Sequence, residues 1–350
     1  MSTYDRIAGL PLRIDGYGLE VLALELAPEL TRLTTVITLH GAGEEGVGED
    51  VVYDAADHEA QLAAGPAQPL AGDWTIDGFS RHLEGLDLFP GGPTRPEWPN
   101  YRRWAFESAA LDLALRQAGA SLADALGLVP RPVTFVVSTR LDGPQGVGRL
   151  RRFLEGTPGL RFKLDPTDDW SPEMMEELAA LGVVDTLDMK GAYDDVPMAV
   201  PTDPRTYARV LERFPGAWIE DPKLTPELRE TLRGAEDRVT WDAPIHSVAD
   251  VAALGWKPRM INVKPSRFGP LSELMAAYDH LRDEGIAAYG GGQTELGPGR
   301  GQIQYLASLF HPDAPNDVAP GGYNAPDPPP GLPGSPLPVA ASPTGFRWGE

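Results

Sequence analysis

Five ionisable residues recur through the middle of the chain, each at the C-terminal end of a short apolar run. They are Lys163, Asp188, Glu220, Asp242 and Lys264. Neighbouring members are 22 to 32 residues apart, which is about the length of one strand with its following helix. In a barrel of parallel strands the C-terminal strand ends converge on one mouth, where active sites lie. We therefore expect these five side chains to meet in space.

The three carboxylates of this set need a counter-ion, because like charges about 4 Å apart repel by roughly 4 kcal/mol at an effective dielectric near 20. Asp188, Glu220 and Asp242 are predicted to bind Mg²⁺, with Mn²⁺ as an alternative, since carboxylate oxygens suit both ions. Lys163 and Lys264 are predicted to be an acid–base pair. A neighbouring metal and a second cation would lower a lysine pKa from about 10.4. The pair could then remove the proton next to a substrate carboxylate, with the metal stabilising the enediolate.

A second interpretation is a non-catalytic barrel whose charges serve structure or bind a carboxylate ligand. Each charged residue, taken singly, could be a solvated helix cap or loop residue. Five such residues at successive strand ends favour the catalytic interpretation, because a barrel without activity has no reason to keep all of them.

The segments that position these residues alternate between strand and helix from residue 132 onward. This alternation predicts a parallel sheet with right-handed crossovers, and eight strands fit a closed barrel better than an open sheet. A doubly wound sheet would usually have a Gly-rich phosphate turn after its first strand, and residues 138–143 are not such a turn. The expected strands are Val133–Val137, Leu160–Leu164, Val184–Asp188, Ala217–Glu220, Arg238–Asp242, Met260–Lys264, Gly285–Tyr289 and Asp317–Pro320.

The first third of the chain has a different pattern, with strands and turns up to about residue 60. Strands are predicted over 18–26 and 34–39, followed by a Gly-rich turn over 41–48. Residues 103–118 form the clearest helix, because small apolar residues recur there at helical spacing. The tail from residue 326 is rich in Pro and Gly, and its two aromatic residues favour packing.

Composition bounds the partners of this 350-residue chain. A net charge of −21 repels nucleic acid and anionic membranes, so neither is expected as a partner. The absence of cysteine excludes disulfides and thiolate chemistry. No stretch approaches the roughly 20 apolar residues of a membrane helix, and residues 1–9 do not resemble a signal peptide. We expect a cytoplasmic homo-oligomer that acts on a small-molecule carboxylate.

Taken as an ordered set, these segments resemble the enolase superfamily, in its muconate-lactonizing-enzyme-like and o-succinylbenzoate-synthase-like branch. The resemblance covers roughly residues 15–325. It implies an α/β fold, a (β/α)7β TIM-like barrel over 131–324 with an α+β capping domain over 1–130, and the tail 325–350 packing on that cap. The matching motifs are Gly46–Glu49, Glu107–Gly127, Arg161–Lys163, Asp188, Trp218–Pro222 with Glu220, Asp242, Lys264–Gly269 and Tyr289–Glu295.

The resemblance also implies roles and a reaction class. Asp188, Glu220 and Asp242 match the three metal ligands, and Lys163 and Lys264 match the two lysines that face opposite sides of the substrate. Such an isomerase or lyase would be a racemase or epimerase, a cycloisomerase, or a syn-dehydratase of the o-succinylbenzoate-synthase kind. The sequence leaves these reactions open.

Three departures from the family pattern affect the surroundings of the predicted ligands. Arg161 replaces the first lysine of the Lys-x-Lys motif, Lys190 stands where the family usually has asparagine, and Ala243 follows Asp242 in place of glutamate. Lys190 is predicted to bind a second acidic group of the substrate, because it points to the same side of its strand as Asp188. Further predicted substrate contacts are Arg161, Gln293 and Glu295.

Overall fold

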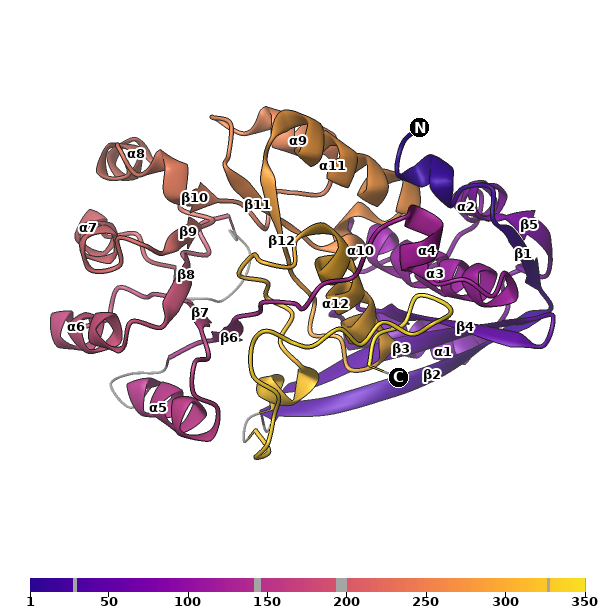
Figure 1. Cartoon of the computed structure of the whole chain (residues 1–350), viewed down its shortest axis with the longest axis horizontal. Helices are drawn as coiled ribbons and strands as arrows, with labels where there is room; N and C mark the ends of the chain where they lie inside the picture. The colour runs from indigo at the N-terminus through magenta and orange to yellow at the C-terminus, as the bar shows by residue number, and fades with distance from the viewer. Residues whose placement is uncertain (28–29, 142–145, 193–199, 326–327, 350) are drawn as a thin grey trace.

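The computed structural model of the chain describes residues 1–27, 30–141, 146–192, 200–325 and 328–349. An antiparallel sheet from the N-terminal third lies along one side of the molecule, and parallel strands with their helices occupy the other side (Figure 1). In the described part of the chain, no helix combines the length and the apolar character that a membrane span requires.

The N-terminal sheet is a meander of β2 (Gly16–Ala27), β3 (Leu30–Gly41) and β4 (Glu44–Asp50), paired antiparallel in that order. The predicted Gly-rich turn over 41–48 is wrong, because the turn consists of Ala42 and Gly43 alone, both with positive φ. The later glycines lie within β4 and serve close packing instead. A Cβ on Gly48 would come 2.0 Å from a backbone oxygen of α3 (Trp98–Gln117).

Shorter elements complete the N-terminal part. Strand β1 (Pro11–Ile14) pairs antiparallel with β5 (Gly72–Thr75). The short helix α4 (Leu122–Leu126) begins at a capping box, in which the Ser121 hydroxyl accepts from the backbone N–H of Asp124. The helices here are α1 (Ala55–Ala64), α2 (Ile76–Glu84), α3 and α4 (Leu122–Leu126), with the 3-10 turn η1 (Tyr4–Arg6) before them.

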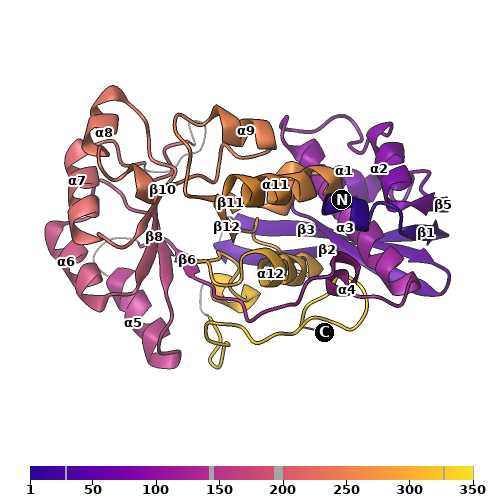
Figure 2. The ribbon, with the colours of Figure 1, turned by 45° about the horizontal axis from the view of Figure 1, so that its top comes forward.

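Five short parallel strands form the second part of the fold, adjacent in the order in which they occur in the sequence. The predicted alternation of strand and helix is confirmed, and α5 to α8 lie together along the outer side of this sheet (Figures 1 and 2). The strands are β6 (Val137–Thr139), β7 (Phe162–Leu164), β8 (Val184–Asp188), β9 (Trp218–Glu220) and β10 (Val239–Thr240), and the helices are α5 (Gly146–Gly156), α6 (Pro172–Leu181), α7 (Pro204–Arg213) and α8 (Pro226–Thr231).

Helices α6, α7 and α8 each begin at strong signals in the sequence. Each has proline at its first position, where no backbone N–H is needed. Each proline follows a capping side chain, Ser171, Asp203 or Thr225, that accepts a backbone N–H of the first turn.

A second parallel pair, β11 (Met260–Val263) and β12 (Ala287–Gly290), follows the five-stranded sheet. Single parallel bridges join Trp241 to Ile261, Gly291 to Asp317, and Phe135 to Asn316. Among the described residues the parallel strands therefore form two sheets linked by bridges, and the eighth predicted strand is reduced to such bridges. The remaining elements are α9 (Val248–Ala253), α10 (Pro265–Phe268), α11 (Leu271–Glu284), α12 (Pro298–Phe310), η2 (Glu236–Arg238) and η3 (Gly321–Asn324).

Buried polar side chains connect the N-terminal sheet to the parallel part. Glu49 at the end of β4 accepts the backbone N–H groups of Leu296, at 2.6 Å, and of Gly297 and Gly299, at 3.0 and 2.9 Å. These groups lie at the start of α12, where a carboxylate is favourable. The tail returns to the same region, since the Phe346 backbone N–H donates to Asp112 of α3 over 2.7 Å.

Candidate active site

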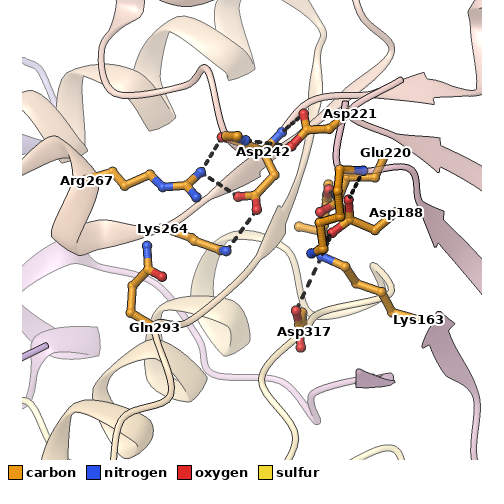
Figure 3. A network of polar contacts seen from close by, with 12 residues as sticks. Lys163, Asp188, Glu220, Asp221, Asp242, Lys264, Arg267, Gln293 and Asp317 are labelled. Atoms are coloured by element: carbon orange, nitrogen blue, oxygen red, sulfur yellow. Dashed lines mark hydrogen bonds and ion pairs between the residues drawn. The ribbon is translucent and has the colours of Figure 1, made fainter. Parts of the chain in front are cut away.

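The five charged residues at the predicted strand ends lie together at the C-terminal ends of the parallel strands (Figure 3). Lys163 is on β7, and Asp188 and Glu220 end β8 and β9, where they are direct partners in the register. Asp242 and Lys264 follow β10 and β11. All five are buried, with at most 8% of each residue exposed.

Lys163 is surrounded by carboxylates. Its ammonium contacts Glu220 and lies 3.2 Å from Asp188 Oδ2 and 3.4 Å from Asp317 Oδ2. Asp317 comes from the segment bridged to β12, so this ammonium joins three strand ends. Sequence reasoning missed Asp317, although it opens the eighth predicted strand.

Asp242 is held by two cations on its own side of the network (Figure 3). Lys264 Nζ donates to Asp242 Oδ2 over 2.9 Å, and Arg267 Nη1 donates to Asp242 Oδ1 over 2.7 Å. Asp221 fixes the loop that carries Asp242, because its carboxylate accepts the backbone N–H groups of Asp242 and Ala243 over 2.9 and 2.8 Å. Its φ of +45° turns the chain directly after Glu220.

One group of carboxylates has the arrangement that a divalent cation needs. Asp188, Glu220 and Asp221 each offer one oxygen, and these three oxygens lie within 4.8 Å of one another. An all-oxygen, all-carboxylate set suits Mg²⁺ or Mn²⁺. The group shares two members with the predicted metal ligands but contains Asp221 in place of Asp242, whose oxygens face Lys264 and Arg267.

Burial and neighbouring cations act in opposite directions on two of these acids. Burial alone would raise the pKa of Asp188. The charges of Lys190 and Lys163 outweigh burial and hold this pKa well below its usual value. Burial likewise raises the pKa of Asp242, and Arg267 and Lys264 hold it well below the usual value. Both carboxylates are therefore ionised at neutral pH.

The pKa values of Glu220 and Lys163 are both raised. Burial and the charge of Asp188 raise the pKa of Glu220 well above its usual value, and Tyr289 donates its hydroxyl to Glu220 Oε2 over 2.6 Å. Burial alone would lower the pKa of Lys163, but Glu220 and Asp188 raise it strongly. The lowering of the Lys163 pKa that we expect assumes a bound metal, and it stays a prediction. A divalent ion on the same carboxylates would act in the opposite direction.

Lys190 lies inside the network. Its ammonium contacts Asp188 and is 3.7 Å from Asp165 Oδ1, and its side chain is 16% exposed. Burial raises the pKa of Asp165 to about 6, and Lys190 opposes this shift. The departure from the family pattern at this position therefore places a cation directly on a predicted metal ligand.

The other predicted substrate contacts lie in different places. Arg161 is bound to Asp185 of β8 and donates to the carbonyl of Gly182 at the end of α6, so the structure does not bring it to the charged network. Gln293 donates to the Tyr101 hydroxyl over 2.8 Å and lies within the close-up of the network (Figure 3). Glu295 accepts the Gln293 backbone N–H over 2.6 Å.

Two sequence-family models cover almost the whole chain. The N-terminal domain of a domain of unknown function, DUF8230, matches residues 5–125. The C-terminal domain of the same family matches residues 129–325. The chain belongs to the DUF8230 family.

Relatives with assigned names connect this DUF8230 chain to racemases and synthases. An N-succinylamino acid racemase of an Amycolatopsis species is 30% identical over 64% of this chain and 60% of its own length. One from Thermus thermophilus is 26% identical over 88% of this chain and 86% of its own length. An o-succinylbenzoate synthase of Bacillus subtilis is 25% identical over 61% of this chain and 57% of its own length. The chain thus spans less than two thirds of two of these three relatives.

Solved structures give the fold of this DUF8230 chain. An enolase superfamily member from Listeria innocua superposes with a TM-score of 0.66, at 17% identity, over 89% of this chain and 86% of its own. A dipeptide epimerase from Enterococcus faecalis gives 0.67 at 15% identity over 96% and 99%. One from Methylococcus capsulatus, complexed with a Mg ion, gives 0.63 at 18% identity over 90% and 88%. The fold that the resemblance to the enolase superfamily predicts is confirmed by these likenesses.

Proposed function

We propose that the chain is a Mg²⁺-dependent isomerase or lyase that removes the proton next to a substrate carboxylate. The observation that carries this proposal is the buried network at the strand ends, in which two lysines from distant strands each contact an acid from another strand. Its named relatives are enzymes, racemases and synthases, which supports catalysis over ligand binding alone. A small-molecule carboxylate as substrate follows from the same relatives. Assembly as a homo-oligomer and a cytoplasmic location stay predictions.

The fold that would carry this activity is a closed (β/α)7β barrel over 131–324 with a cap over 1–130. The bridges at Asn316 and Asp317, which join the first and seventh strands through the eighth segment, support the closure. The two family domains, which end at 125 and begin at 129, support the boundary. Packing of the tail 325–350 is supported by the contact between Phe346 and Asp112.

Asp188, Glu220 and Asp242 are proposed to hold the ion. The metal-like grouping of carboxylate oxygens supports the first two. For the third ligand we retain Asp242. Both oxygens of either acid are engaged, but those of Asp221 accept backbone N–H groups and fix the loop, whereas those of Asp242 accept from the side chains of Lys264 and Arg267. The ion when bound would stabilise the negative charge that develops on the substrate carboxylate.

Lys163 and Lys264 are proposed to be the two bases. They belong to β7 and to the end of β11, and they contact different acids, Glu220 and Asp242. Substrate bound between them would present one face of its reacting carbon to each amine. Lys190, Gln293 and Glu295 are proposed to contribute to substrate selection. The overall reaction can be racemisation or epimerisation, cycloisomerisation or syn-dehydration.

The experiment that tests this function is exchange of α-protons in D₂O, followed by NMR. Pooled carboxylic acids, including N-succinylamino acids, are incubated with the protein and Mg²⁺. We expect exchange in at least one substrate. If no pool shows exchange and a carboxylic acid nevertheless binds to the protein, the result would favour the non-catalytic barrel.

Two variants then assign the bases. Lys163→Met and Lys264→Met keep the volume of the side-chain stem without the amine. Each is expected to lower turnover by about 10²- to 10⁴-fold, which is what general acid–base catalysis contributes. If the enzyme is a racemase, each variant should still exchange the α-proton of one enantiomer. Full turnover in either variant contradicts the two-base mechanism.

A further inference from the structure

Asp165 is an acid of the strand-end network that the proposed proton transfer does not use. It directly follows β7, one residue beyond the register pair of Leu164 with Leu187, so the next residue across from it is Asp188 at the end of β8. Its Oδ1 is buried and makes no hydrogen bond with any of the described residues. A buried acceptor without a donor is unfavourable. A donor that came within hydrogen-bond distance of this oxygen would therefore stabilise the site.

Lys190 is a cation that can supply this donor. Its ammonium contacts Asp188 Oδ2 and lies 3.7 Å from Asp165 Oδ1, which is beyond the length of a hydrogen bond. Hydrogen bonds between an ammonium and a carboxylate are about 2.7 to 2.9 Å long. A shift of roughly 1 Å would therefore bring the Lys190 ammonium into hydrogen-bond range of Asp165.

The backbone of Lys190 can stay in place during such a shift. Its N–H donates to Asp188 Oδ1 over 3.1 Å, which holds that carboxylate from one side. The other oxygen, Asp188 Oδ2, faces the ammonium groups of Lys190 and Lys163. Rotation about the side-chain bonds of Lys190 is thus enough to take its ammonium away from Oδ2.

A divalent ion on Asp188 Oδ2 would force both ammonium groups away, because cations on one oxygen repel each other strongly. Lys163 has other acids to contact, Glu220 and Asp317. For Lys190 the corresponding acid is Asp165. Its unfilled Oδ1 is therefore placed where the displaced charge has to go.

We propose that Asp165 is a positioning residue that receives the Lys190 ammonium when a divalent ion binds Asp188. The inference rests on the proposed function, which places the ion there. In the metal-free protein Lys190 lies on Asp188, and in the metal-bound protein it lies on Asp165. The second acid thus allows a lysine to stand two residues after a metal ligand, because the lysine charge stays neutralised in both states.

A double-mutant cycle in Mg²⁺ affinity tests this role. Isothermal titration gives dissociation constants for the metal-free full chain as wild type, Asp165→Asn, Lys190→Asn and the double variant. Asp165→Asn should weaken Mg²⁺ binding about tenfold when Lys190 is present, as the loss of one hydrogen bond between charged groups would give. In the Lys190→Asn background the same replacement should weaken binding several-fold less, because there is no ammonium to receive.

The cycle also separates this role from a direct effect of Asp165 on the ion. If the loss of affinity is equal or larger in the Lys190→Asn background, Asp165 acts on the ion as a ligand or through its charge, and the inference is refuted. Asp313→Asn is the control for the change in net charge. Asp313 pairs with Arg131 on the surface, so its replacement should leave the dissociation constant unchanged.

A crystal structure of the wild type with Mn²⁺ provides a second readout that does not depend on any variant. We expect Lys190 Nζ within hydrogen-bond distance of Asp165 Oδ1 and out of contact with Asp188. An ammonium that stays on Asp188 beside the ion overturns the inference. If neither the wild type nor any variant binds a divalent ion, the proposed function itself fails, and the inference fails with it.

Discussion

At the scale of single residues, each proposed metal ligand at the strand ends also contacts a lysine. A divalent ion must therefore compete with lysines for its ligands. Lys163 and Lys190 both contact Asp188, and Lys264 contacts Asp242. The same contacts that keep Asp188 and Asp242 ionised therefore oppose metal binding. This competition gives the metal proposal a measurable signature.

The first prediction concerns the metal ligands. Mg²⁺ or Mn²⁺ added to metal-free protein should raise its melting temperature, because an ion that binds only the folded state stabilises it. Glu220→Gln should remove most of this response, and so should Asp242→Asn. Asp221→Asn is the discriminating variant. If it alone loses the response while Asp242→Asn retains it, the third ligand is Asp221 and the sequence prediction is wrong.

The second prediction concerns Lys190, which has a φ of +52°. Asparagine adopts this left-handed conformation more readily than most residues, so Lys190→Asn should fold normally. We expect it to bind Mg²⁺ more tightly, because a cation beside Asp188 is removed, and to show a raised KM, because the proposed contact with substrate is lost. Isothermal titration and steady-state kinetics measure the two effects.

Lys257→Asn is the control for Lys190. Lys257 is exposed and pairs with Glu284 on the surface, so its replacement should alter neither quantity. Unchanged metal affinity and kinetics in Lys190→Asn would leave Lys190 without a role in the site.

At the scale of elements, local signals in the sequence predict the helices of the parallel part well. Capping side chains before proline mark where α6, α7 and α8 begin. The eighth strand is predicted over Asp317–Pro320, but its reduction to single bridges could not be foreseen. These bridges depend on Asn316, whose amide donates to Thr134 and accepts from Gly290. Such contacts join residues far apart in the sequence, and no local pattern reports them.

In the site, too, some residues could be predicted from the sequence and others could not. The five charged residues at strand ends are visible in the sequence because strand ends of a parallel sheet share one edge. Asp221 follows directly after Glu220 in the same motif, yet its support of the next loop depends on a turn at positive φ. Tyr289 reaches Glu220 from β12, which belongs to the other parallel sheet, and its spacing gives no indication of that contact.

The third prediction tests the packing of β4 on α3. Gly48→Ala should lower the free energy of unfolding by about 3 kcal/mol, since overpacking typically costs roughly 1 to 3 kcal/mol and the opposing atoms belong to the helix backbone. Gly16→Ala in β2 is the matched control, because a Cβ there meets nothing within 4 Å, and it should be neutral or slightly stabilising. Urea unfolding measures both. Equal stability of the two variants would show that β4 can move away from α3 at little cost.

At the scale of the whole molecule, the first and last parts of the parallel fold meet around Asn316 and His311. His311 Nδ1 lies 2.7 Å from Asn316 Oδ1, and its Nε2 lies 3.2 Å from the Tyr278 hydroxyl of α11. Because Asn316 Oδ1 can only accept, the neutral imidazole carries its proton on Nδ1. One buried, uncharged histidine therefore connects α11 with the segment that bridges the first and seventh strands.

The fourth prediction follows from the charge state of His311. Burial lowers its pKa from 6.5 to about 4, so between these values the unfolded chain binds a proton that the folded chain does not. Its contribution to stability is present above about pH 6.5 and is lost as the pH falls to about 4, which amounts to about 3 kcal/mol for this one group. Other buried acids titrate in the same range, so the measurement is a difference. His311→Gln cannot be protonated, and the difference in unfolding free energy between wild type and variant should shrink steadily as the pH falls from 6.5 to 4. If the difference in unfolding free energy does not change with pH, His311 is protonated in the folded chain over this range. The contact between α11 and Asn316 would then contain a buried charge.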